Sequence, residues 1–243
     1  MFNRSSSPLQ LAISRTIVVA YFYAMRSCEF STTHGTRQTK IITLSNIRFS
    51  RKDNSTINQD NEDMFSAFAV SLTFIDQKNG EKDERTTQEN TGDPVLNPVR
   101  QLASIVRMLR NHHMSSNDTP ICTCVNSSND LVTFSQSQAL CHLRSTAAAI
   151  GPDKLGFAPN DIGTKSIRSS TAMAWYLAGV PHPSIQLMGR WKSETWLCYI
   201  RKQVLEFSKG LSKALLQNEF LHTLPPLNEG LSSSRTRPGH SYH

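Results

Sequence analysis

The feature that most constrains the fold of this chain is the Asn-Gly pair at 79–80. The run before it, FSAFAVSLTFI at 65–75, is rich in β-branched and aromatic residues, which favours a β-strand. The short run RTTQ at 85–88 follows the pair and predicts a returning strand. Asn-Gly between two such runs is a strong signal for a tight hairpin, because both residues tolerate the positive φ that the turn needs. We therefore expect an antiparallel sheet.

Helices are expected on both sides of this hairpin. The segment SSSP at 5–8 is typical of a capped helix start, and apolar residues follow at helical spacing until MRSCEF at 25–30. A second strand is predicted at 41–49, and a polar loop at 50–63. Further helices are predicted at 98–110, 136–150, 161–178, 182–189 and 194–216, with a small hairpin within 121–134. The predicted fold class is α+β, mainly helical with a small antiparallel β-sheet.

Composition narrows the class of partner. The chain has 26 Lys and Arg against 19 Asp and Glu, a net charge of +7, which favours a polyanion such as nucleic acid; a basic protein without such a partner is the alternative. Five cysteines, with no Cys-x-x-Cys pair, indicate reduced thiols and an intracellular location. No metal site is evident. The apolar run from Leu9 to Ala24 is too short and too interrupted to span a membrane.

Four segments carry residues suited to phosphate chemistry. They contain Arg26 and Glu29 in AMRSCE, Lys78 in QKNGEK, Lys165 and Arg168 in GTKSIRSS, and Arg190, Trp191 and Tyr199 in LMGRWKSETWLCYIR. Guanidinium groups are permanently charged and match phosphate oxygens, and an activated tyrosine oxygen can act as a nucleophile. Each residue alone also has a structural interpretation, since Arg26 can pair with Glu29 and Tyr199 can be a core aromatic residue.

Taken in this order, the segments resemble the catalytic domain of the tyrosine recombinases, the phage-integrase superfamily. AMRSCE resembles the segment of the first catalytic arginine, QKNGEK that of the catalytic lysine and KSIR that of the second arginine. LAGVPHPSIQLMGRW resembles the stretch leading to the family's His/Trp position, and YIR the nucleophile segment. The resemblance assigns catalytic roles to Arg26, Lys78, Lys165, Arg168, Trp191 and Tyr199. It covers about 8–216, the expected catalytic domain, and leaves 217–243 as a tail expected to be disordered.

This resemblance implies cleavage and rejoining of DNA strands without a cofactor or metal. Tyr199 would attack a phosphodiester and form a 3′-phosphotyrosine bond, while two arginines hold the non-bridging oxygens. Trp191 would donate its indole N–H to the phosphate. Lys78, or alternatively Lys82, would protonate the leaving 5′ oxygen. Further phosphate contacts are expected from basic residues: Arg144, Arg190, Lys192, Arg201 and Lys202.

Three departures from the family pattern keep alternatives open. Lys165 stands where the family usually has histidine, and Trp191 precedes Tyr199 by eight positions where many relatives have nine. The N-terminal DNA-clamp domain is expected to be absent. The leading hypothesis is a recombinase or integrase domain of a mobile element, acting on double-stranded DNA, as a tetramer if it follows the family, and nuclear in a eukaryotic host. The alternatives are an inactive DNA-binding remnant and a type IB topoisomerase-like nicking-closing enzyme.

Overall fold

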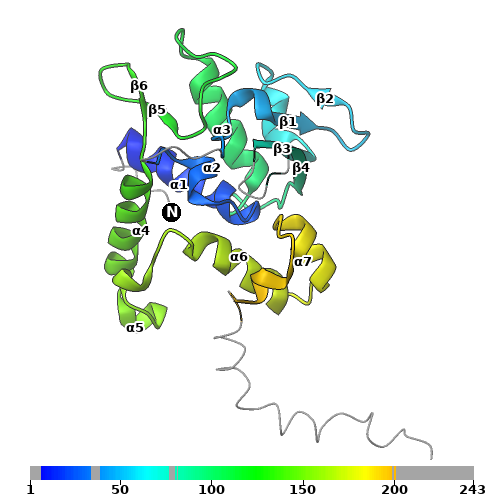
Figure 1. The fold of residues 1–243 in the computed structure, drawn as a ribbon. Helices are drawn as coiled ribbons and strands as arrows, with labels where there is room; N and C mark the ends of the chain where they lie inside the picture. Colours follow the sequence, from blue (N-terminus) through cyan, green and yellow to red (C-terminus); the bar gives the residue numbers. More distant parts are fainter. Residues whose placement is uncertain (1–6, 34–38, 77–79, 81, 199, 201–243) are drawn as a thin grey trace, which may run out of the picture. The chain divides into compact units, whose positions relative to one another are not determined.

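A computed structural model describes residues 7–33, 39–76, 80, 82–198 and 200 of the chain (Figure 1). These residues belong to one compact unit. The α-helices are α1 (Pro8–Phe22), α2 (Ser27–Phe30), α3 (Pro98–Arg110), α4 (Gln136–Ile150), α5 (Pro152–Leu155), α6 (Ser166–Leu177) and α7 (His182–Met188). The strands are β1 (Ile47–Ser50), β2 (Thr56–Ile57), β3 (Ala69–Asp76), β4 (Lys82–Glu89), β5 (Thr123–Val125) and β6 (Leu131–Thr133). Four 3-10 turns are η1 (Leu44–Asn46), η2 (Glu62–Ser66), η3 (Pro159–Asp161) and η4 (Glu194–Trp196).

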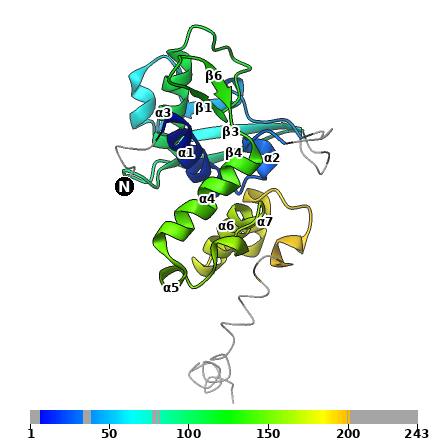
Figure 2. The same ribbon diagram turned by 90° about the vertical axis from the view of Figure 1, so that its left-hand side faces the viewer.

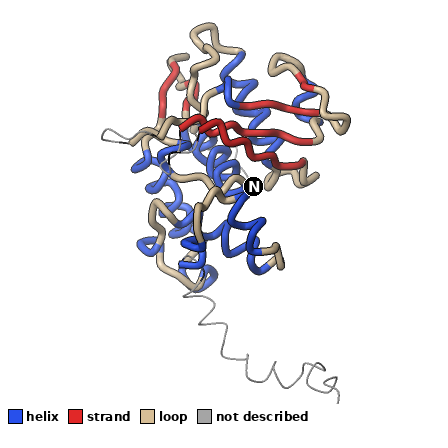
Figure 3. The backbone as a smooth tube through the Cα atoms, turned by 45° about the vertical axis from the view of Figure 1, so that its right-hand side comes forward, coloured by secondary structure: helices blue, strands red, loops and turns tan. Residues whose placement is uncertain are grey.

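The main sheet is antiparallel, with strand order β2-β1-β3-β4. Figure 3 draws the strands in red. The predicted hairpin is confirmed, because β3 and β4 pair along their length and Gly80 has φ of +80°. The returning strand β4 is longer than predicted. Its backbone pairs with β3 at charged residues such as Lys82 and Glu84, which the sequence pattern did not assign to a strand. The strand predicted at 41–49 begins only at Ile47, because the residues before it form the turn η1, in which the Thr43 N–H donates to Asn46 Oδ1 at 2.9 Å.

Helix α1 lies at the centre of the described unit. Its start is as predicted: Ser7 caps the helix in a reciprocal pair with Gln10, and Pro8 occupies the first turn. Helix α1 packs against α3 and β5 on the sheet side and against α4 and α6 on the other (Figures 1 and 2). Because it contacts both groups of elements, its end is a place where distant parts of the chain meet.

The later helices agree with most of the sequence prediction. Helices α3 and α4 have the predicted bounds, and β5 and β6 form the predicted small hairpin. Helix α6 begins at Ser166 and not at 161, because the chain first makes η3, which the Asp161 carboxylate closes by accepting the Ala158 N–H at 2.8 Å.

The predicted helix at 194–216 starts with η4, and its residues from 201 onward lie outside the described part, as does the tail at 217–243. The α+β class is confirmed in that the described residues form several helices and a small antiparallel sheet. Within the described residues, no helix combines the length and the apolar character needed to cross a membrane.

Candidate functional site

The end of α1 forms the base of the candidate site. Two hydrogen bonds close the helix: Ala24 N–H to Tyr21 O at 3.2 Å and Met25 N–H to Ala20 O at 2.9 Å, with Ala24 at φ +45°. This is the Schellman pattern, in which a left-handed residue ends a helix. The carbonyl groups of Tyr23 and Ala24 lie beyond the last turn and accept hydrogen bonds from two arginine side chains. The partial negative charge of a helix C-terminus favours such cations.

Arg26 and Glu29 form the next layer, around the short helix α2. Arg26 is the residue before the helix, and its N–H donates to Glu29 Oε2 at 2.8 Å, while its Nη1 pairs with Oε1 at 2.8 Å. The Arg26 side chain is 20% exposed, whereas that of Glu29 is 1% exposed. The predicted pairing of these two residues is therefore confirmed, and one guanidinium of the site reaches the surface.

Arg190 supplies a second guanidinium, which is fully buried. Its Nη2 donates to Glu29 Oε2 at 2.8 Å and its Nη1 to Tyr23 O at 2.9 Å, and its Cζ lies 3.5 Å from the centroid of the Phe74 ring. Burial lowers the pKa of Arg190 from its ordinary value; the charge of Glu29 opposes this shift and that of Arg26 adds to it. Glu29 thus binds both Arg26 and Arg190, which are more than 160 residues apart in the sequence.

Arg168 supplies the third guanidinium, from the first turn of α6. The residue is 4% exposed. This agrees with the sequence, which predicted that Arg168 points inward from a mainly apolar helix. Its Nη1 donates to Ala24 O and its Nη2 to Gly189 O, both at 2.5 Å. The Trp191 ring covers the guanidinium, with 4.4 Å between Cζ and the ring centroid. The second predicted arginine is therefore held by backbone carbonyls, one of which belongs to Ala24, two residues before Arg26.

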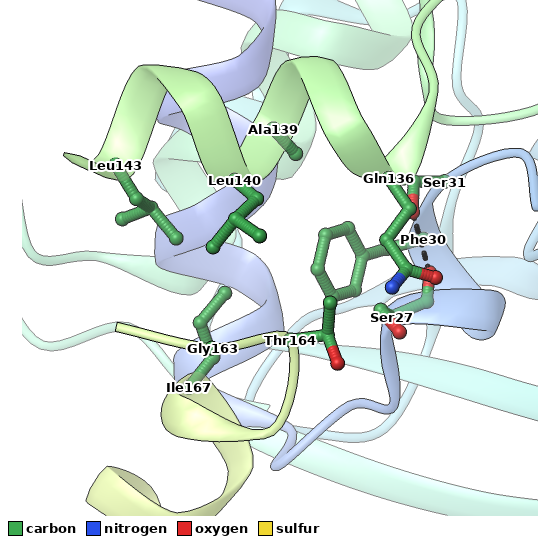
Figure 4. A pocket seen from close by; sticks show the side chains of 10 residues that line it. All are labelled: Ser27, Phe30, Ser31, Gln136, Ala139, Leu140, Leu143, Gly163, Thr164 and Ile167. Carbon is green, nitrogen blue, oxygen red and sulfur yellow. Dashed lines mark hydrogen bonds between the residues drawn. The ribbon is translucent and has the colours of Figure 1, made fainter. Parts of the chain in front are cut away.

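Lys165 lies before α6, on the surface. The segments that carry Lys165 and Arg26 are neighbours, because one small pocket is lined both by Ser27, which follows Arg26, and by Thr164, which precedes Lys165 (Figure 4). Apolar side chains of Phe30, Leu140, Leu143 and Ile167 form much of its wall. The structure therefore brings the backbone at Lys165 close to the segment of Arg26, and Lys165 itself is exposed.

The β3–β4 hairpin contributes to the site through the face that carries Phe74. Glu84 lies opposite Phe74 in the sheet and acts electrostatically on Arg190. Lys82 is two residues farther toward the hairpin tip, opposite Asp76. Lys78 lies outside the described residues, as does Tyr199. The choice between Lys78 and Lys82 as the general acid therefore stays open.

The five residues predicted to contact DNA differ in their surroundings. Arg190 is buried, because its side chain is 0% exposed and paired with Glu29, and its DNA contact stays a prediction. Lys192 is exposed. Arg144 is half-buried, and its Nε donates to Ile162 O at 3.0 Å, so that it supports the loop before α6. Its phosphate contact stays a prediction, and Arg201 and Lys202 lie outside the described residues.

The position of Arg190 in the site is the main feature that sequence reasoning missed. A signal for it was present in the spacing: Arg190 precedes Tyr199 by nine positions, the spacing that Trp191 lacks. The roles of Phe74 and Gly189 had no sequence signal, because they depend on contacts with arginines from distant segments.

In the described part of the chain, no cluster of three or more His, Cys, Asp or Glu side chains could hold a metal ion. No protein-family model matches the sequence, and no curated protein matches it.

Proposed function

We propose that this chain is the catalytic domain of an enzyme that cleaves and rejoins DNA strands by the tyrosine recombinase reaction. The observation that carries the proposal is the collection of Arg26, Arg168 and Arg190 around the end of α1. Three guanidinium groups there exceed the charge of the nearby carboxylates of Glu29 and Glu84. A site with surplus positive charge and an arginine at the surface favours a phosphate.

In the proposed reaction, the Tyr199 oxygen attacks a DNA phosphorus atom, and the 5′ oxygen of the next nucleotide leaves. The products are a 3′-phosphotyrosine bond and a 5′-hydroxyl group. Lys78 or Lys82 protonates that oxygen, and attack by a 5′-hydroxyl group reverses the step. Arg26 and Arg168 stabilise the additional negative charge of the pentavalent transition state. A tyrosine with an ordinary pKa of about 10 needs such a cationic environment to react near neutral pH.

Arg190, and not Trp191, stands at the spacing from Tyr199 that the resembled family uses for its His/Trp position. It stands nine residues before Tyr199, which is the spacing of the His/Trp position in many relatives of the resembled family. In this chain, its guanidinium is bound to Glu29, the same carboxylate that binds Arg26. We therefore assign Arg190 to holding Glu29 and Arg26 in place, and not to contacting DNA.

A second candidate function is DNA binding without cleavage, by an inactive remnant of such an enzyme. It is favoured by the burial of Arg168 and Arg190, whose terminal nitrogens already donate to groups of the protein. Arg168 can contact a phosphate only if its surroundings rearrange locally. An active enzyme must make this rearrangement when it binds DNA, whereas an inactive remnant can bind DNA without it.

A nicked suicide DNA substrate distinguishes these candidates. The nick lets the short cleaved product diffuse away, so a covalent protein–DNA complex accumulates on a denaturing gel. We expect the wild-type protein to form the complex, Tyr199→Phe to form none, and Tyr176→Phe, a matched change in a half-buried tyrosine of α6, to form it as the wild type does.

The other outcomes have defined meanings. Salt-sensitive DNA binding without a covalent complex would favour the remnant. A covalent complex that persists in Arg168→Ala would contradict the proposed mechanism. Exchange of strands between two labelled duplexes would distinguish a recombinase from a topoisomerase-like enzyme, which needs a single duplex.

A further inference from the structure

We infer that Trp191 is a positioning residue whose ring holds the guanidinium of Arg168, and that Gly189 provides the space for that ring. This inference rests on the proposed function, in which Arg168 binds the reacting phosphate. It differs from the role that the family resemblance implies for Trp191, which is donation of the indole N–H to the phosphate. The two roles require different parts of the same side chain, so they can be separated by experiment.

The first observation is the stacking of the two side chains. The Cζ atom of Arg168 lies 4.4 Å from the centroid of the Trp191 ring, and both residues are buried, at 4% and 8% exposure. A guanidinium on an indole face is attracted by the electrons of the ring, and the attraction is larger where water is excluded. The ring therefore restrains the position of the guanidinium through its face.

The second observation concerns Gly189. Its φ of −83° is one that any residue can adopt, so the backbone conformation does not require glycine. Space does: a Cβ atom at this position would lie 1.5 Å from Cζ3 and 2.0 Å from Cε3 of Trp191. The indole ring thus lies directly against the backbone of Gly189, and an alanine there would displace it.

The third observation is that the same short segment holds Arg168 in two ways. The carbonyl of Gly189 accepts a hydrogen bond from Arg168 Nη2 at 2.5 Å, and the ring of Trp191 covers the guanidinium. The Ala24 carbonyl accepts from Nη1 at 2.5 Å. The two carbonyls hold the terminal nitrogens and the ring restrains the guanidinium face, so this segment limits how far Arg168 can move when it contacts a phosphate.

The test measures single-turnover formation of the covalent complex at saturating DNA, per folded molecule, in four variants. Trp191→Ala and Gly189→Ala should slow this rate about 100-fold, because small displacements of a catalytic group have effects of that order. Trp191→Phe keeps an aromatic face and lacks the N–H, and its rate should stay within about tenfold of the wild type. The matched control is Gly163→Ala, where an added Cβ meets no atom within 4 Å.

Fluorescence reports the ring position without depending on catalysis. Trp175 and Trp196 are replaced by Phe, which leaves Trp191 as the only indole. Trp196 Nε1 has no hydrogen-bond partner among the described residues, so its replacement loses no such bond there. Acrylamide should quench Trp191 weakly in this background and more strongly after Gly189→Ala, with no such increase after Gly163→Ala.

Each result decides between the proposals. If Trp191→Phe is as slow as Trp191→Ala, the N–H is the functional part and the inference is overturned. It is also overturned if Gly189→Ala cleaves at the wild-type rate. A lower yield of folded protein with an unchanged rate per folded molecule would likewise overturn it, because Trp191 would then serve packing alone. If the wild-type protein forms no covalent complex, the proposed function fails, and the positioning role fails with it even where quenching confirms the ring position.

Discussion

At the scale of single residues, Glu29 organises the candidate site. Its carboxylate accepts hydrogen bonds from the Arg26 N–H, from the Arg26 side chain and from Arg190, all at 2.8 Å. A buried charge is tolerated only when such partners compensate its loss of hydration. The sequence predicted the Arg26–Glu29 pair from a three-residue spacing, whereas the Arg190–Glu29 pair joins residues that only the fold brings together.

Replacing Glu29 with Gln should therefore destabilise the protein strongly. The variant leaves the Arg190 guanidinium buried without its carboxylate, and breaking a buried pair in this way costs about 3–5 kcal/mol. The free energy of unfolding in urea measures the loss. Glu62→Gln is the control, since Glu62 pairs with Arg107 at the surface, where ion pairs contribute at most about 1 kcal/mol. Similar losses in both variants would contradict this account of Glu29.

At the scale of secondary structure, a polar contact joins α1 to α4. The Ser14 hydroxyl and His142 Nε2 lie 2.9 Å apart, and both residues are half-buried. Burial lowers the pKa of His142 below its ordinary value. The unfolded chain therefore binds a proton at this histidine at a higher pH than the native protein does.

This shift predicts the direction of the pH dependence of stability. As the pH falls from 7 through the unfolded-state pKa of about 6.5, the unfolded chain gains the proton first, so the free energy of unfolding decreases. Below the native pKa both states are protonated, and the decrease stops. Urea unfolding at pH 7 and pH 5 should show a smaller loss for His142→Gln than for the wild type. An unchanged loss would contradict the assignment, and His113→Gln, at an exposed position, is the control.

The helices and strands also differ in how well the sequence predicted them. Helices α1, α3 and α4 were predictable because caps and apolar spacing are local signals. Strand β4 was predicted too short, since Lys82 and Glu84 have no strand preference of their own and are held by pairing with β3. The strand expected at 41–49 was too long for the opposite reason: its first residues favour a strand, but local side-chain hydrogen bonds close a turn.

At the scale of the whole molecule, the surplus of basic residues predicts DNA binding that depends on salt. Each phosphate contact changes the slope of log K against log salt by about −0.9 on duplex DNA. Lys165→Gln and Lys192→Gln, both at exposed positions, should each make the slope less negative by about 1. Titrations from 50 to 200 mM salt measure it.

The control for these charge changes is Arg107→Gln. Arg107 lies on α3, which is on the other side of α1 from α6 (Figure 2), and it is paired with Glu62. Its removal should leave the slope unchanged. Equal effects of all three substitutions would indicate attraction by net charge alone, without a binding face formed by the segments around α6 and α7.

The sequence by itself determined the class of structure and the segments suited to phosphate chemistry. Caps, periodicity and the Asn-Gly turn act within a few residues, so they are readable along the chain. Only the tertiary structure decided which charged side chains from distant segments meet. The sequence predicted that Arg190 is a basic residue at the surface beside Lys192. The fold instead buries it between Phe74, Tyr23 and Glu29. The physical reason is that burying a guanidinium requires acceptors from several segments at once, and no local pattern specifies where those segments converge.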